Sequence, residues 1–140
     1  WERKVIAEEE QQKDFVCWLR NPSRGSWALC IPYEIDNEKK PTYPDFLIIR
    51  KDNLEYVVDI LEPHDPTRQD NLGKAKGFAE YARQNPGVGR IQLIRMQKDS
   101  TGKERAFRLD MSKSSIRDKV SRCASNNELN HVFESEGFFQ

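Results

Sequence analysis

Apolar segments of this sequence contain acidic residues that a hydrophobic core does not need. Three carboxylates and one histidine interrupt the segments between residues 43 and 64, namely Asp45, Asp59, Glu62 and His64. Burying such charges is unfavourable unless they are paired or coordinate a metal ion. Mg²⁺ prefers one or two carboxylates together with waters and the phosphate oxygens of a substrate. The residue types therefore indicate a site for Mg²⁺ or Mn²⁺.

The pairing of two predicted strands decides which of these carboxylates meet. A two-residue turn at positions 52 and 53 places Asp45 opposite Ile60. Because side chains alternate along a strand, Glu62 and His64 then share the face of Asp45. A three-residue loop over positions 51–53 instead pairs Asp45 with Asp59 and turns Glu62 away. Both registers bring two carboxylates together, and we favour Asp45 with Glu62.

The elements that carry these residues follow an α/β order. Hydrophobic spacing and turn residues predict helices over residues 1–20, 71–84, 112–123 and 129–133, and strands over 27–33, 45–50, 54–62, 91–96 and 106–109. A charged loop is expected at 36–40. The strands at 45–50 and 54–62 are apolar on both faces, which is typical of a hairpin at the centre of a covered sheet. The sequence therefore predicts an α/β protein with a mixed sheet.

Length, charge and cysteine content restrict the class of protein. The chain has 140 residues, of which 36% are hydrophobic, and this suits one domain with a single core. Its apolar runs are far shorter than the roughly 20 residues of a membrane span, so no membrane crossing is expected. Three widely spaced cysteines fit neither a disulfide framework nor a zinc site, and they indicate a reducing, cytoplasmic setting.

The formal net charge of zero hides a difference between the two halves of the chain. Residues 1–70 contain 10 basic and 15 acidic residues, whereas residues 71–140 contain 13 basic and 8 acidic residues. This distribution of charge is expected if an acidic, cation-binding region lies beside a basic, phosphate-binding surface. An ordinary solvated surface gives the same distribution of charge.

Short motifs around the carboxylates resemble the PD-(D/E)xK nuclease superfamily. Pro44-Asp45, a hairpin and then Glu62-Pro63-His64 follow its signature. Further segments resemble the C-terminal endonuclease domain of type III restriction subunits and related helicase-linked defence proteins: Trp18-Leu19-Arg20-Asn21, Ile31-Pro32-Tyr33 and Tyr43-Pro44-Asp45-Phe46-Leu47. The resemblance covers roughly residues 1–96. It implies a restriction-endonuclease-like mixed sheet flanked by helices, with an αβββαβ core, and magnesium-dependent cleavage of DNA.

The resemblance also implies partners. Because the chain begins at Trp1 without a Met or a leader, we expect a nuclease-like domain excised from a larger protein. A helicase or ATPase region would lie on the same parent chain, within a prokaryotic restriction or antiviral defence system. The sequence is also compatible with a homo-oligomer. The alternative function is a catalytically inactive module that docks nucleic acid or protein.

One position departs from the family pattern, because His64 stands where the family has a lysine. An imidazole with an ordinary pKa of about 6.5 is a weaker source of positive charge than lysine. His64 could act as a base or a metal ligand. The positive charge that the family lysine supplies would then come from Lys74 or Lys76 on the following helix.

The resemblance assigns the remaining roles. The implied catalytic residues are Asp45, Glu62, His64 and Lys74. The implied metal ligands are Asp45, Glu62 and a glutamate of the first helix, either Glu2 or Glu9. Basic residues close in sequence to this cluster are candidates for contact with DNA phosphates: Arg68, Lys74 and Lys76.

Overall fold

The computed structural model describes residues 2–140, so Trp1 lies outside the described part. The described chain forms four helices and eight strands. Their bounds are α1 Glu2–Glu10, β1 Phe15–Arg20, β2 Ile31–Ile35, β3 Glu38–Thr42, β4 Phe46–Asp52, β5 Glu55–Pro63, α2 Asn71–Gln84, β6 Ile91–Lys98, β7 Glu104–Asp110, α3 Ser114–Arg122, α4 Asn126–Glu136 and β8 Phe138–Phe139. No helix within residues 2–140 is long and apolar enough to cross a membrane.

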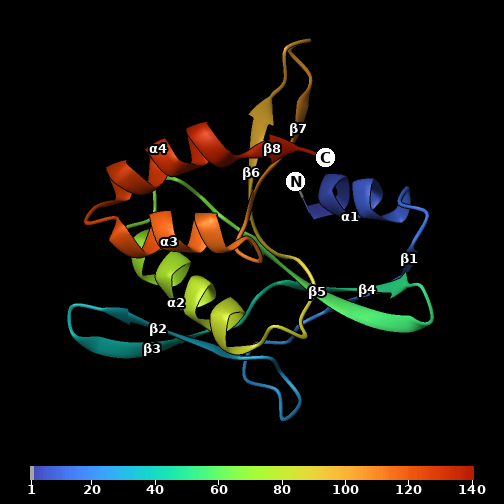
Figure 1. The fold of residues 1–140 in the computed structure, drawn as a ribbon, viewed down its shortest axis with the longest axis horizontal. Helices are drawn as coiled ribbons and strands as arrows, with labels where there is room; N and C mark the ends of the chain where they lie inside the picture. Colours follow the sequence, from blue (N-terminus) through green and yellow to red (C-terminus); the bar gives the residue numbers. More distant parts are fainter. Residues whose placement is uncertain (1) are drawn as a thin grey trace.

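Six of the strands form one mixed sheet in the order β1-β4-β5-β6-β7-β8. β5 and β6 are parallel, and the other neighbours are antiparallel. α1 packs on one face of this sheet, and α2, α3 and α4 gather on the other side (Figure 1). The predicted mixed α/β sheet flanked by helices is confirmed. The elements α1, β1, β4, β5, α2 and β6 follow the αβββαβ order, with the β2–β3 hairpin inserted.

The helix predicted over residues 1–20 is wrong in its second half. α1 ends at Glu10, and residues 15–20 form β1, which pairs with β4. The aromatic and β-branched residues of this segment favour a strand, and the ladder with β4 provides the partner that a helix there would lack. β1 lies at the edge of the sheet, where Val16 and Leu19 remain exposed.

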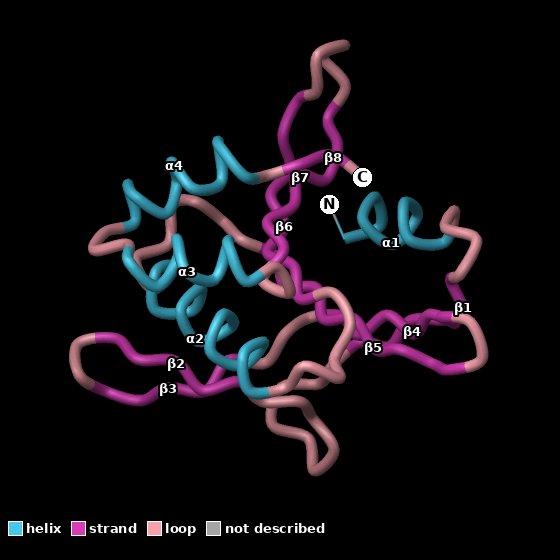
Figure 2. Tube along the Cα trace, viewed as in Figure 1, coloured by secondary structure: helices cyan, strands magenta, loops and turns pink. Residues whose placement is uncertain are grey.

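The strand predicted over 27–33 and the charged loop predicted over 36–40 are also displaced. The strand is β2, and the residues after it form a hairpin with β3. Asp36 and Asn37 both have positive φ, at 52° and 61°, as the two central residues of a tight hairpin turn require. This hairpin forms a sheet of its own beside α2 (Figure 2).

The central hairpin formed by β4 and β5 has a register that neither alternative contained. Asp52 pairs with Glu55, so the turn lies one residue later in the sequence. Phe46 consequently pairs with Leu61, and the next position outward places Asp45 beside Glu62. The hairpin is central in the sheet as predicted, but its turn end, unlike its other end, is largely exposed.

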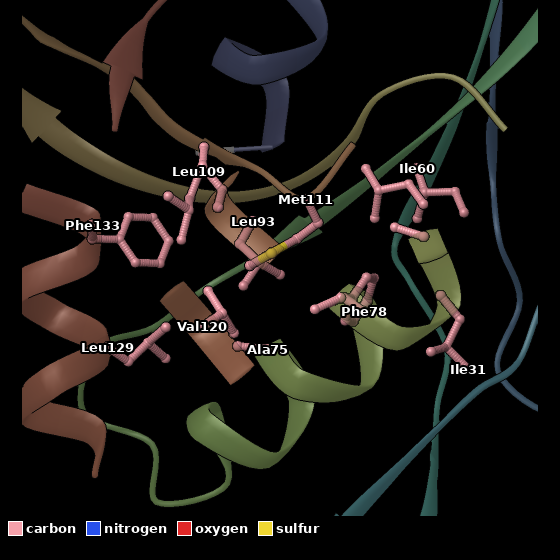
Figure 3. Packing of buried hydrophobic residues seen from close by; sticks show 14 of the residues in the cluster. Ile31, Ile60, Ala75, Phe78, Leu93, Leu109, Met111, Val120, Leu129 and Phe133 are labelled. Atoms are coloured by element: carbon pink, nitrogen blue, oxygen red, sulfur yellow. The ribbon is translucent and has the colours of Figure 1, made fainter. Parts of the chain in front are cut away.

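Alternation along β5 separates two hydrophobic clusters. Ile60 belongs to the cluster formed with α2, α3 and α4, and the next residue, Leu61, packs with Val5 and Ile6 of α1. Figure 3 shows the first cluster, in which Phe78 of α2 and Phe133 of α4 face the sheet. Side chains of β5 therefore reach both layers of helices.

Two glycines of α2 allow the β2–β3 hairpin to approach this helix closely. A Cβ at Gly77 would lie 2.7 Å from the carbonyl oxygen of Pro32 and 2.9 Å from the Cβ of Tyr33. A Cβ at Gly73, one turn earlier, would collide with the carbonyl oxygen of Glu34. The hairpin is thereby held against the first half of α2, beside the candidate site.

Candidate functional site

The carboxylates of Asp45 and Glu62 meet at one end of the β4–β5 hairpin. Asp45 directly precedes β4, and its backbone N–H donates a hydrogen bond to Oε2 of Glu62 over 3.2 Å. The Glu62 side chain is buried and that of Asp45 is partly buried. Both line a polar pocket of about 250 Å³. The favoured pairing of Asp45 with Glu62 is therefore present, although it arises from a different register.

α2 brings a lysine to this carboxylate pair. Nζ of Lys74 lies 4.0 Å from Oε1 of Glu62 and 3.5 Å from Oδ2 of Asp70. The hydroxyl of Tyr33 donates a hydrogen bond to Asp70 over 3.2 Å, and its ring centroid lies 6.0 Å from Nζ of Lys74. The β2–β3 hairpin thus supports the lysine through Tyr33 and Asp70.

Burial makes the ionised forms of both carboxyls unfavourable. Burial raises the pKa of Glu62 to about 8, although the positive charge of Lys74 acts in the opposite direction. Burial also raises the pKa of Asp45, and the charge of Glu2 adds to this effect. Both carboxyls would bind a proton or a cation more readily than an exposed carboxyl does.

His64 lines the same pocket but supplies no positive charge. Its backbone N–H donates to the carbonyl of Ile94 over 2.7 Å, and its ring stacks on Phe133 with 4.8 Å between centroids. Burial, followed by the charges of Arg95 and Lys74, lowers the pKa of His64 to about 3. The imidazole is therefore neutral at pH 7, and Lys74 is the cation next to Glu62.

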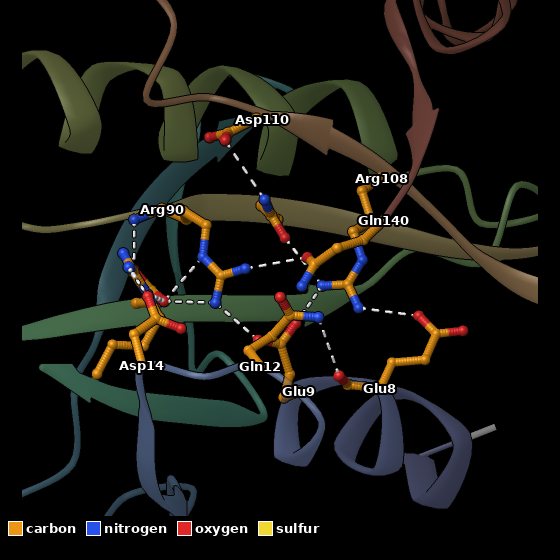
Figure 4. Close-up of polar contacts among 11 residues, drawn as sticks. Glu8, Glu9, Gln12, Asp14, Arg90, Arg108, Asp110 and Gln140 are labelled. Carbon is orange, nitrogen blue, oxygen red and sulfur yellow. Dashed lines mark hydrogen bonds and ion pairs between the residues drawn. The ribbon is translucent and has the colours of Figure 1, made fainter. Parts of the chain in front are cut away.

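The structure does not bring Glu9 or Asp59 to the pocket. The Glu9 side chain is fully buried against the other face of the sheet, where it contacts Arg90 over 2.6 Å and also Arg108. Asp59 is paired with Arg50 and Arg90. Figure 4 shows Glu9, Arg90 and Arg108 within this set of polar contacts.

Glu2 is the residue of α1 that lies near Asp45. Its negative charge contributes to the raised pKa of Asp45, and its Oε2 accepts a bond from Arg20 over 2.5 Å. Of the two glutamates considered for the metal, the structure therefore favours Glu2, with Arg20 as its present partner.

The donor set suits a cation that takes few protein ligands. Within residues 2–140, no group of three or more His, Cys, Asp or Glu side chains is arranged to hold a metal ion. Asp45 and Glu62 supply two oxygen-bearing side chains at one pocket. Mg²⁺ is commonly coordinated by two carboxylates and several water molecules, whereas a zinc site would need more ligands from the protein.

Two of the three residues considered for phosphate contact line the pocket. Arg68 and Lys74 do so, but Lys76 lines a separate hollow of about 910 Å³ between α2 and the β2–β3 hairpin. The larger hollow is lined by other acidic residues, Glu34, Asp36 and Glu80, and not by Asp45 or Glu62. Lys76 is therefore not brought to the candidate site.

The sequence did not predict the residues that contact His64 at the pocket, Arg95 and its partner Asn130. Arg95 contacts His64 and Asn130, and its guanidinium lies 3.8 Å from the ring centroid of Phe133. A charged residue within the apolar strand around residues 91–96 was a signal for Arg95. Asn130 gave no such signal, because an Asn on a helix is usually a solvated surface residue.

Comparisons with known proteins give a family. No solved structure matches the chain significantly. Protein YagJ of Escherichia coli (strain K12) is 33% identical over 122 residues, which is 86% of this chain and 49% of that protein. The chain thus spans about half the length of this curated relative. The YagJ family matches residues 1–139, and the chain belongs to the YagJ family.

Proposed function

We propose that this chain is a metal-dependent nuclease domain that hydrolyses DNA phosphodiester bonds. The observation that carries the proposal is the placement of Asp45 beside Glu62, with the ammonium group of Lys74 4.0 Å from Glu62. Carboxylates and a lysine at the end of a central hairpin are also what the resemblance to PD-(D/E)xK nucleases leads us to expect.

The electrostatics of the pocket support a bound cation. Both carboxyls have raised pKa values although Lys74 acts on each of them, so a divalent ion would stabilise their ionised forms. Asp45 and Glu62 would hold Mg²⁺ or Mn²⁺, with Glu2 as a further candidate. When bound, such an ion polarises the phosphate and lowers the pKa of a water molecule.

Residues of the chain itself would bind and orient the substrate. Lys74 presents a positive charge at the pocket, where it would offset negative charge that develops on the phosphoryl oxygens. Arg68 lines the same pocket and would contact a neighbouring phosphate. His64, being neutral, would contribute hydrogen bonding and not charge.

The wider setting is proposed on the resemblance alone. It would be a cytoplasmic restriction or antiviral defence system, in which a helicase or ATPase region of the same parent chain delivers DNA to this domain. A full-length family member should then couple ATP hydrolysis to DNA cleavage, and ATP-independent cleavage would argue against that partner.

A second candidate function is a non-catalytic module that docks nucleic acid. The neutral, buried His64 at the lysine position favours this candidate. A docking module would bind DNA with an affinity that falls as salt rises, and it would cleave no strand with any metal.

The test is nicking of supercoiled plasmid by the chain in Mg²⁺, in Mn²⁺ and in EDTA. We expect metal-dependent nicking that Asp45→Asn and Glu62→Gln each reduce by at least about 100-fold. Glu80→Gln is the matched control, because Glu80 is an exposed carboxylate on α2 whose partner is Arg83. Equal nicking by Asp45→Asn and the wild type would remove the site assignment. Salt-dependent DNA binding without nicking would favour the docking module.

A further inference from the structure

The two ring nitrogens of His64 have different surroundings. Nε2 lies 3.0 Å from Nη2 of Arg95. A guanidinium group has only hydrogen-bond donors, so Nε2 must accept this bond and cannot itself be protonated. In a neutral imidazole the single proton is then on Nδ1. The contact with Arg95 therefore selects one of the two neutral tautomers of His64.

Arg95 is held in a position that serves this contact. Its Nη2 also donates to Oδ1 of Asn130, and its guanidinium lies over the ring of Phe133. In the described part of the chain Arg95 has no ion pair within 4.0 Å, although the charge of Glu134 acts on it at longer range, and its Nε is buried without a hydrogen-bond partner. Burying a guanidinium without a carboxylate is unfavourable. The close contacts of Arg95 are thus those with His64, Asn130 and Phe133, and none of them is with a carboxylate.

The other ring nitrogen remains available. Within residues 2–140 no hydrogen bond to Nδ1 of His64 is formed, and the sealed side-chain nitrogens that lack a partner are those of Arg95 and Arg108. His64 lines the pocket shared by Asp45, Glu62 and Lys74, and because Nε2 is engaged by Arg95, Nδ1 is the ring nitrogen left for a ligand of this pocket.

We propose that Arg95 is a positioning residue that holds His64 as the neutral tautomer protonated on Nδ1, so that His64 presents a directional N–H donor, and not a base, to a phosphate oxygen of the substrate. The assignment of the phosphate rests on the proposed nuclease function, whereas the tautomer does not. A lysine could supply both a positive charge and a hydrogen-bond donor, and here these two roles would be divided between two residues. Lys74 supplies the charge, and His64 supplies an oriented hydrogen bond.

The tautomer can be measured without any nuclease activity. The chain has two histidines, so long-range ¹H–¹⁵N correlation on histidine-labelled protein gives two ring systems, and the exposed His131 is the internal control. At pH 8 we expect His64 to show a protonated Nδ1 and an unprotonated Nε2, and the pattern of His131 to stay unchanged when Arg95 is substituted. Arg95→Met should move His64 towards the averaged pattern, and Arg95→Lys should restore the wild-type pattern. A protonated or averaged Nε2 of His64 in the wild type would overturn the proposal.

Two substitutions of His64 test the donor itself. Asn places an amide N–H near the position of Nδ1, whereas Gln places its amide near Nε2. We expect His64→Asn to retain nicking within about 10-fold of the wild type and His64→Gln to lose about 100-fold. Equal loss in both variants contradicts the donor role. If the wild type nicks no DNA, the nuclease function fails, and the NMR pattern still decides the tautomer independently.

Discussion

β5 presents buried carboxylates to both faces of the sheet, and the two faces treat them differently. On the α1 face, Glu9 contacts Arg90 and Arg108 (Figure 4). On the same face, Asp59 contacts Arg50 and Arg90. On the α2 face, Glu62 and Asp45 have Lys74 as their nearby cation. Each carboxylate of the first group forms close ion pairs with two arginines, whereas in the second group, within residues 2–140, only Glu62 has a cation within 4.0 Å, that of Lys74. Burial of a carboxylate alone therefore does not mark a functional site, and unsatisfied charge at a pocket is the more informative feature.

The largest expected difference is in stability. Asp59→Asn leaves two arginines without their carboxylate in a buried network, and we expect it to lower the free energy of unfolding by about 3 to 5 kcal/mol. Asp45→Asn should change it by less than about 1 kcal/mol, because that carboxyl is only partly buried and already disfavoured in its charged form. Urea denaturation of both variants measures the contrast. Equal losses would erase the distinction between the two faces.

The next effect is on catalysis and concerns Lys74, the pocket cation within 4.0 Å of Glu62. Lys74→Met should reduce metal-dependent plasmid nicking by about 100-fold and leave the urea midpoint nearly unchanged. Lys76→Met, on the same helix but at the other hollow, is the matched control and should nick at close to the wild-type rate. A larger loss in the Lys76 variant would transfer the role to that lysine.

The pH dependence of stability should also differ between the faces. Burial raises the pKa of Glu62 from 4.5 to about 8, so its contribution to stability is fully present below pH 4.5 and is lost as the pH rises through 8. In EDTA, the wild type should lose about 4 kcal/mol over this window relative to Glu62→Gln. Denaturation series at pH 5, 7 and 9 measure the difference. Parallel curves for the two proteins would mean that Glu62 is ionised without a metal.

The smallest effect sharpens the role of the β2–β3 hairpin. Gly77→Ala introduces a Cβ against Pro32 and Tyr33, and we expect a loss of about 1 kcal/mol in stability together with a several-fold loss of nicking through the displaced Lys74. Gly87→Ala is the control, because its Cβ would have no heavy atom within 4 Å. Unaltered nicking by the Gly77 variant would show that Lys74 does not depend on the hairpin.

Local sequence signals predicted much of the fold. The limits of α2 at residues 71 and 84 are confirmed, and so are the strands at 45–50 and 91–96, because in these segments apolar spacing and turn residues agree. Residues 15–20 were assigned to a helix, since the preceding Glu-rich stretch is helical and the pairing of β1 with β4 is a tertiary contact. β8, with two residues, carries too little pattern to be predicted.

The candidate site was predicted in part. Asp45 and Glu62 stand out because they are acidic residues in apolar surroundings. The opposite burial of Glu9 could not be predicted, because it depends on Arg90 and Arg108, which are far away in the sequence. Likewise, the neutral state of His64 depends on Arg95 and on burial by α4. Non-local partners, rather than residue type, thus decide the role of each ionisable group.

Asp59 and Glu62 are three residues apart on β5 and point to opposite faces of the sheet. Inserting or deleting one residue between them would turn both acids to the same face, so that one of the two groups would lose a member. Ile60 and Leu61 can therefore be replaced by apolar residues of similar size. The number of residues between Asp59 and Glu62, however, must stay the same. In related sequences, length variation should be absent from this segment even where its composition varies.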